Sequence, residues 1–142
     1  MDKLSYNNKN IYYQKLENTF KFFDSQDLDF YYILENPELG FHPKSCMSRP
    51  FDIFPNQCRI KYEQYFQRQN EYRTNAIDLA NKYKKIKILD PEKLYCDDKY
   101  CYAIKDGKML YADDDDHSVD GSLEQAKYFM DDLISNEVRN AN

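Results

Sequence analysis

The chain has 142 residues, 42% of them hydrophobic and 16% aromatic, and a formal net charge of −5 at pH 7. A chain of this length can bury one core, so we expect a single domain over residues 1–142. The acidic balance and the lack of clustered Lys and Arg argue against a nucleic-acid partner. No apolar run approaches the roughly 18 residues of a membrane span, and the N-terminal residues lack the apolar core of a signal peptide. Expressed alone, the chain is therefore expected in the cytoplasm.

The first part of the chain predicts a helix, a strand and a long loop. Apolar residues at steps of three and four predict an amphipathic helix over residues 9–24. Residues 28–34 (LDFYYIL) are short, aromatic and continuously apolar, as in a strand covered on both faces. Four of the five prolines follow, which predicts an irregular loop over residues 35–57.

The rest of the chain predicts a helix, a strand, a hairpin and a last helix. A stripe of tyrosines at helical spacing marks a helix over residues 58–83. Isoleucines alternating with lysines predict a strand over 85–90, and Asp106-Gly107 is a turn signal for a hairpin over 100–111. The last helix is expected over 122–136. Its capping box would be Ser122 and Gln125, and its buried face Leu123, Ala126, Met130 and Leu133.

Helices that alternate with buried strands are typical of an α/β fold. We therefore predict a partial three-layer α/β/α sandwich of flavodoxin-like type, with a mostly parallel sheet and a C-terminal hairpin. Only two core strands are evident, which is few for such a sheet, so we expect the domain to be incomplete.

The four cysteines form two neighbouring pairs along the chain, Cys46 with Cys58 and Cys96 with Cys101. Neither spacing is the two-residue gap of a zinc knuckle, so no metal site is expected. Two short-range disulfides, Cys46–Cys58 and Cys96–Cys101, are one interpretation and would imply an oxidising compartment. Four unpaired thiols are the alternative.

His117 is the main candidate for chemistry, because Asp114 precedes it by three residues on the loop that enters the last helix. In such a loop the carboxylate can bond one ring nitrogen while the other faces a cleft. That arrangement fixes the tautomer and stabilises the imidazolium formed during general-base catalysis. A solvated surface histidine beside acids is the simpler alternative. No cofactor is expected.

Neighbouring polar residues have simpler interpretations. Four of them fit the first positions of an EF-hand loop: Asp116, Ser118, Asp120 and Gly121. The twelfth position falls on Lys127, where calcium requires a bidentate Glu, so no calcium site is expected. His42 has no spaced partner and is expected to be structural or solvent-facing. Ser118 and Ser122 are expected to be turn and cap residues.

Two segments carry a family resemblance. Residues 94–122 (LYCDDKYCYAIKDGKMLYADDDDHSVDGS) resemble the C-terminal part of the SGNH domain attached to membrane acyltransferases that O-acetylate cell-surface glycans. Residues 35–51 (ENPELGFHPKSCMSRPF) are similar to the proline-rich loop that follows the central strand of that domain. The likeness extends roughly from Leu28 to Phe129.

The resemblance implies roles for two residues and for several partners. In that family a Ser of a Gly-Asp-Ser block attacks the acyl donor, a His is the base, and an Asp three residues earlier orients it. The last two roles fall on His117 and Asp114. The implied partners are the membrane-embedded, nucleophile-bearing N-terminal part of the same acyltransferase and an acceptor glycan. The family's domain is tethered to membrane spans outside the cytoplasm.

The sequence departs from the family pattern in two respects. It contains no Gly-Asp-Ser, and no Gly-x-Asn-Asp that would supply oxyanion donors. An ungapped match to the family's Asp-Asp-Asp-His-Leu-Ser places Asp116 at the histidine position and Asp113 at its acidic partner. His117 then serves only if the loop shifts by one residue, because Asp cannot readily replace imidazole as a base.

Three hypotheses follow. The first is the C-terminal half of an SGNH-type O-acyltransferase or esterase domain, silent alone because the nucleophile and oxyanion hole are missing. The second is a non-catalytic binding or assembly module that uses an open strand edge and an exposed half-core. The third is a small esterase with Ser45 or Ser48 as its nucleophile.

Overall fold

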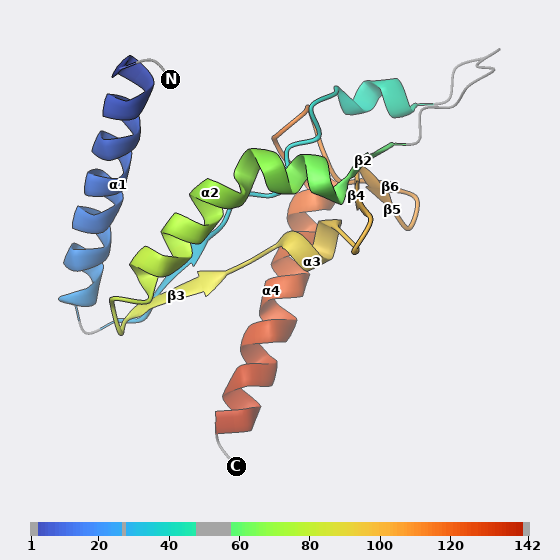
Figure 1. The fold of residues 1–142 in the computed structure, drawn as a ribbon. Helices are drawn as coiled ribbons and strands as arrows, with labels where there is room; N and C mark the ends of the chain where they lie inside the picture. The colour runs from blue at the N-terminus through green and yellow to red at the C-terminus, as the bar shows by residue number, and fades with distance from the viewer. Residues whose placement is uncertain (1–2, 27, 48–57, 141–142) are drawn as a thin grey trace. The chain divides into compact units, whose positions relative to one another are not determined.

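The computed structural model describes residues 3–26, 28–47 and 58–140 and shows a mixed α/β fold (Figure 1). The chain divides into two compact units, Met1–Leu34 with Glu71–Leu89, and Glu35–Asn70 with Asp90–Asn142. The expected fold class is confirmed, with helices, small sheets and one parallel strand pair. That residues 1–142 form a single domain stays a prediction.

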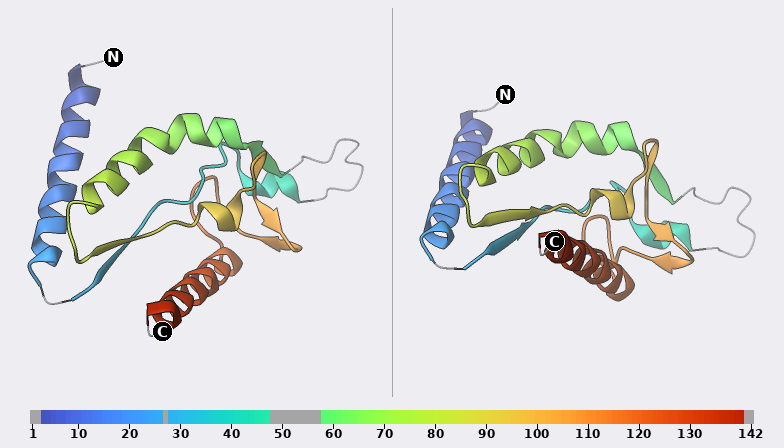
Figure 2. Two further views of the ribbon diagram at one scale, coloured as in Figure 1. Left: turned by 60° about the horizontal axis from the view of Figure 1, so that its bottom comes forward. Right: turned by 90° about the horizontal axis from the view of Figure 1, so that it is seen from below.

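The first unit places two helices against a parallel pair of strands. It contains α1 (Lys3–Asp24), β1 (Phe30–Ile33), the second half of α2 (Tyr62–Ala80) and β3 (Ile86–Leu89). Strands β1 and β3 run side by side in all three views (Figures 1 and 2), with Phe30 opposite Ile86. The core consists of Leu16, Phe20, Leu34, Ala76, Leu79, Ala80 and Ile86.

The expectation that this strand is covered on both faces is wrong. Phe30 and Tyr32 pack against the core, whereas Tyr31 and Ile33 are 38% and 48% exposed. Successive strand residues point to opposite faces, and the helices of this unit cover only one of them. On the other face Tyr31 and Ile33 are therefore partly exposed, beside Lys87 of β3.

The second unit is built from short strands and two small clusters. Strand β2 (Arg59–Lys61) pairs antiparallel with β4 (Tyr100–Tyr102), and β5 (Ile104–Lys105) pairs with β6 (Lys108–Met109). The 3-10 turn η1 (Pro43–Cys46), helix α3 (Glu92–Tyr95) and helix α4 (Val119–Asn140) complete the unit. The buried residues of the two clusters are Leu39, Tyr95, Ala103, Leu110 and Tyr111, and Ile60, Tyr65 and Cys101.

Several expected boundaries change in this unit. The helix expected over 58–83 begins only at Tyr62, because residues 59–61 form β2 and Cys58 has a left-handed φ of 52° that a helix does not accept. The hairpin expected over 100–111 is shortened to β5 and β6, because β4 pairs with β2 instead. The loop expected over 35–57 contains η1, and its residues 48–57 lie outside the described part of the chain.

The start of α4 and its buried face both differ from expectation. The helix begins at Val119, and the Ser118 hydroxyl accepts the Gly121 N–H at 2.9 Å, so Ser118 rather than Ser122 is the N-cap. Leu123 and Met130 are 54% and 55% exposed, whereas Phe129 is buried. The buried side of the helix is the one that contains Gly121 and Phe129. An added Cβ at Gly121 would overlap the Leu110 carbonyl group, so only glycine lets the helix approach so closely.

The cysteine pairs behave differently. Cys96 and Cys101 form the expected disulfide. The expected Cys46–Cys58 disulfide is absent, and both residues remain thiols. Among the described residues, no helix combines the length and apolar character that crossing a bilayer requires.

Candidate active site around His117

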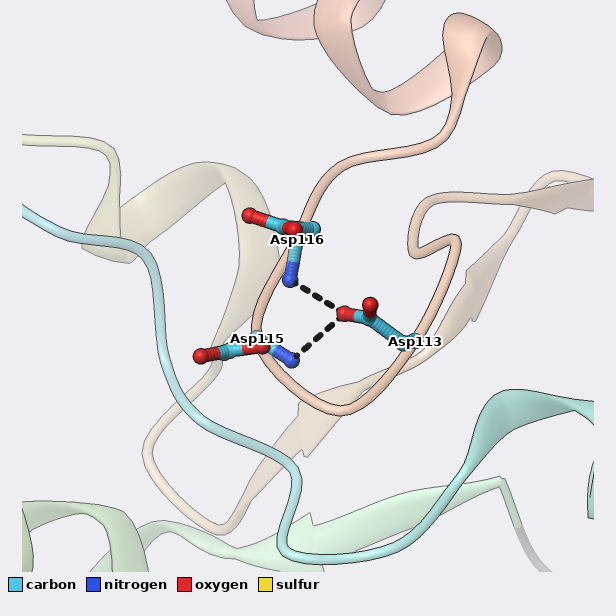
Figure 3. A group of neighbouring side chains, drawn as sticks. All are labelled: Asp113, Asp115 and Asp116. Atoms are coloured by element: carbon cyan, nitrogen blue, oxygen red, sulfur yellow. Dashed lines mark hydrogen bonds between the residues drawn. The ribbon is translucent and has the colours of Figure 1, made fainter.

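An acidic loop of residues 112–116 is closed at its base and places His117 just before the start of α4. The Ala112 N–H donates to the Asp116 carbonyl at 2.8 Å, and Tyr111 pairs with His117 across the base of the loop. The Asp113 carboxylate accepts the N–H groups of Asp115 at 3.3 Å and of Asp116 at 2.8 Å (Figure 3). These two bonds lower the pKa of Asp113 and make it the residue that shapes the turn.

The loop is fastened to the segment of residues 36–39. The Asn36 side-chain amide donates to the Asp115 carbonyl at 2.9 Å, and the Leu39 N–H donates to the Asp114 carbonyl at 2.8 Å. The buried Tyr111 hydroxyl donates to the Pro37 carbonyl at 2.7 Å. Three hydrogen bonds to residues far away in the sequence therefore fix the loop that precedes His117.

Gln69, on the first half of α2, also binds the segment of residues 36–39. Its side chain is 4% exposed and makes two bonds. The amide oxygen accepts the Glu38 N–H at 3.0 Å, and the amide nitrogen donates to the Asn36 carbonyl at 3.1 Å. A buried amide with both ends bonded is strongly directional, so it fixes the position of this segment.

The His117 ring packs beside two buried tyrosines, Tyr95 and Tyr111, which also contact each other. Its plane is 15° from that of Tyr95, with ring centroids 5.8 Å apart, and the Tyr111 centroid is 6.5 Å away. Tyr95 is 1% exposed, and its hydroxyl donates to Gln125 of α4 at 3.0 Å. The Nε2 atom of His117 is buried and has no hydrogen-bond partner among the described residues.

Burial lowers the pKa of His117 below its ordinary value of 6.5, and the negative charge of Asp116 opposes this shift. The ring is therefore neutral near pH 7. A neutral imidazole with an unpaired ring nitrogen is the form that a general base requires.

The structure places Asp114 and His117 in one loop without joining them. Both residues are described, and neither a hydrogen bond nor an ion pair connects the Asp114 carboxylate to the imidazole. Asp114 is exposed, and Asp116 is the acid whose charge acts on the ring. The orienting role of Asp114 stays a prediction.

The remaining candidates have structural roles where they are described. Nδ1 of His42 accepts the Lys44 N–H at 3.2 Å and caps η1. The Ser45 hydroxyl donates to the His42 carbonyl at 2.8 Å, and Ser48 lies outside the described residues. Asp113, Asp115 and Asp116 each offer an oxygen within 4.8 Å of the others, an arrangement common in exposed acidic turns. The turn bonds account for it.

Sequence reasoning missed Asn36, Gln69 and Tyr95, and it assigned Gln125 to a capping box. None of these residues carries a local signal, because their partners lie 30 to 79 residues away in the sequence. Only the mixture of prolines and polar residues in the 35–57 loop indicated that this segment has a function.

We expect His117 to titrate below pH 6.5, measured by proton NMR and assigned with His117→Gln. Asp116→Asn should lower the pKa further, because that charge raises it, whereas Asp114→Asn should leave it unchanged. The unfolded chain binds this proton more tightly than the folded one. Folding stability should therefore decrease as pH falls through about 6.5, and His117→Gln should remove that loss. A midpoint above 6.5 would mean that the aspartates outweigh burial.

The structure thus contains an α/β unit with a partly buried, neutral histidine before its last helix, and the buried Nε2 of that histidine has no partner among the described residues. The family model of the SGNH domain (fused to AT3 domains) matches residues 2–131, so the chain belongs to that family. It is an SGNH-type domain related to acyltransferases and esterases. Neither the curated proteins nor the solved structures include a match to this chain.

Proposed function

We propose that the chain is the part of an SGNH-type O-acyltransferase or esterase domain that supplies the base, and that His117 is this base. The observation that carries the proposal is the buried Nε2 of His117, which has no partner among the described residues. Leaving such an atom unpaired costs about 1–3 kcal/mol, so it calls for a specific explanation. A hydroxyl from another segment that binds Nε2 of His117 explains why this nitrogen has no partner here.

The chemistry is an acyl transfer in two steps. A serine oxygen attacks the acyl donor, Nε2 of His117 takes the serine proton, and that proton then leaves with the donor's leaving group. In the second step a sugar hydroxyl attacks the acyl-serine, and His117 takes its proton and returns it to the serine oxygen. The chain contains no Gly-Asp-Ser block, so we assign the serine to a nucleophile-bearing partner segment.

We further propose that Asp114 orients the imidazole once that partner is in place. The spacing from Asp114 to His117 matches the family's Asp-x-x-His, in which the acid holds the imidazole in the tautomer that the base requires. Asp116 is the rival, because it already acts electrostatically on the ring.

The family context supports a membrane-tethered domain outside the cytoplasm that acetylates cell-surface glycans. The Cys96–Cys101 disulfide is consistent with this location, since disulfides persist in oxidising compartments. The acceptor is then a polysaccharide hydroxyl, and the partner is the membrane-embedded part of the same acyltransferase.

A non-catalytic assembly module is the second candidate. Large apolar side chains are exposed on β1 and α4, namely Tyr31, Ile33, Leu123, Met130 and Ile134. Exposed apolar surface of this kind is typical of protein contacts. A monomer in size-exclusion chromatography that binds no hydrophobic dye would count against this candidate.

The catalytic proposal predicts that the purified chain alone does not react with a fluorophosphonate probe, which labels activated serines. His117 has no serine to activate among the described residues, and Ser45 is a turn residue. Intact-mass spectrometry after incubation measures the labelling. Stoichiometric labelling that disappears in His117→Ala would show instead that this chain is a complete esterase, with Ser45→Ala and Ser48→Ala identifying the nucleophile.

A further inference from the structure

Cys46, at the end of η1, and Cys58, just before β2, have neighbouring side chains. Both side chains pack against the cluster around Tyr95 and Tyr111, and Cys58 lies close enough to raise the pKa of the Cys46 thiol. Neither residue takes part in the disulfide of this unit. The two residues are thus a neighbouring pair of thiols inside a folded unit.

Both thiols are held by ordered backbone. Cys46 ends the η1 turn, which His42 caps at its start. The Cys58 carbonyl accepts the Ala103 N–H at 2.8 Å, next to the ladder of β2 and β4. Both cysteines are therefore anchored through their backbones beside the same buried cluster.

We propose that Cys46 and Cys58 form a redox-sensitive pair that a disulfide oxidant converts into a second cross-link, a reaction separate from the proton transfer proposed for His117. One thiolate attacks a sulfur of oxidised glutathione and releases one reduced glutathione. The other thiolate then attacks the protein sulfur of the mixed disulfide and releases the second. Two electrons pass from the pair to the oxidant, and the two protons end on the glutathione thiols.

The surroundings of the pair determine how fast its thiols react. Burial, together with the neighbouring Cys58, raises the pKa of Cys46 to about 12. Near neutral pH this sulfur is therefore a thiol, and the thiol is a poor nucleophile. Oxidation should accordingly be slow at neutral pH and accelerate as pH rises.

Trypsin makes the proposal directly testable, because Pro50 blocks cleavage after Arg49 and both thiols fall in one peptide, Ser45–Arg59. Cys96 and Cys101 fall in two others, Leu94–Lys99 and Tyr100–Lys105. The full chain is incubated with oxidised glutathione at pH 8, blocked with N-ethylmaleimide, digested and analysed by mass spectrometry. We expect Ser45–Arg59 to lose two hydrogens and to bind no maleimide.

Two controls separate this result from general oxidation. Cys46→Ser and Cys58→Ser should each give a stable glutathione adduct instead of the internal link. In the wild-type chain the link should raise the melting temperature by about 10 °C, because it closes a short loop in the unfolded state. Glutathione on both wild-type thiols, or a link from Ser45–Arg59 to either of the other peptides, would overturn the proposal.

Discussion

Replacing Gly121 by alanine should lower the free energy of unfolding by about 3 kcal/mol. A Cβ at this position would lie 2.8 Å from the carbonyl carbon of Leu110 and closer still to its oxygen. Both atoms belong to the backbone, so neither can rotate out of the way. The first turn of α4 would have to move away from Leu110, and His117, a few residues before it, would lose its support. Urea unfolding followed by circular dichroism measures the change.

Two neighbours provide matched controls for this substitution. Ser122→Ala changes an exposed residue of the same turn and should shift stability by no more than about 0.5 kcal/mol. Ser118→Ala removes the N-cap and should cost about 1 kcal/mol. At an ordinary helical position, glycine to alanine stabilises by about 1 kcal/mol. A gain of that kind in Gly121→Ala would contradict the close approach of α4 to Leu110.

Local patterns predicted three of the four α-helices of the described residues and both parallel strands, but they missed α3 and misplaced several helix ends. The spacing that predicts α1 and the apolar run that predicts β1 are properties of consecutive residues, so they are visible without the fold. The N-cap illustrates the limit of such patterns. Ser122 and Gln125 satisfy the capping-box spacing, yet the helix begins earlier, because Ser118 also bonds the Met109 carbonyl and Gly121 packs on Leu110.

Non-local pairing explains what the sequence could not predict. The partner of β4 is β2, with Ile60 opposite Cys101, and no turn signal connects them. The same holds for the site. The Asp-x-x-His spacing located His117, but its burial by Tyr95 and the anchoring of its loop by Asn36 depend on contacts across the unit.

In an assembled domain, His117→Gln should reduce acylation of the partner serine by about 10²–10⁴-fold, the usual contribution of a general base. Glutamine approximates the size of the ring and retains polar atoms, but it cannot accept a proton near neutral pH. The substitution should change the free energy of unfolding little, because Nε2 makes no bond to the described residues that it would break. The decrease in the acylation rate would therefore measure how much proton transfer by His117 contributes to it.

The aspartates of the loop provide the controls for this prediction. Asp114→Asn should reduce the rate if its carboxylate orients the ring, as the family motif implies. Asp116→Asn should have a smaller effect, because Asp116 acts on His117 only through its charge. Asp113→Asn should weaken the turn without removing the base, since its carboxylate accepts two backbone N–H groups.

The most direct test mixes the purified chain with a polypeptide that carries the Gly-Asp-Ser block of an SGNH domain and follows fluorophosphonate labelling of that serine. A size-exclusion run of the same mixture first establishes that the two bind. We expect labelling of the serine to require the chain and to be lost with His117→Gln. Labelling by the complex that survives His117→Gln but is lost in Asp116→Asn would contradict it, and would place the functional position at Asp116 instead.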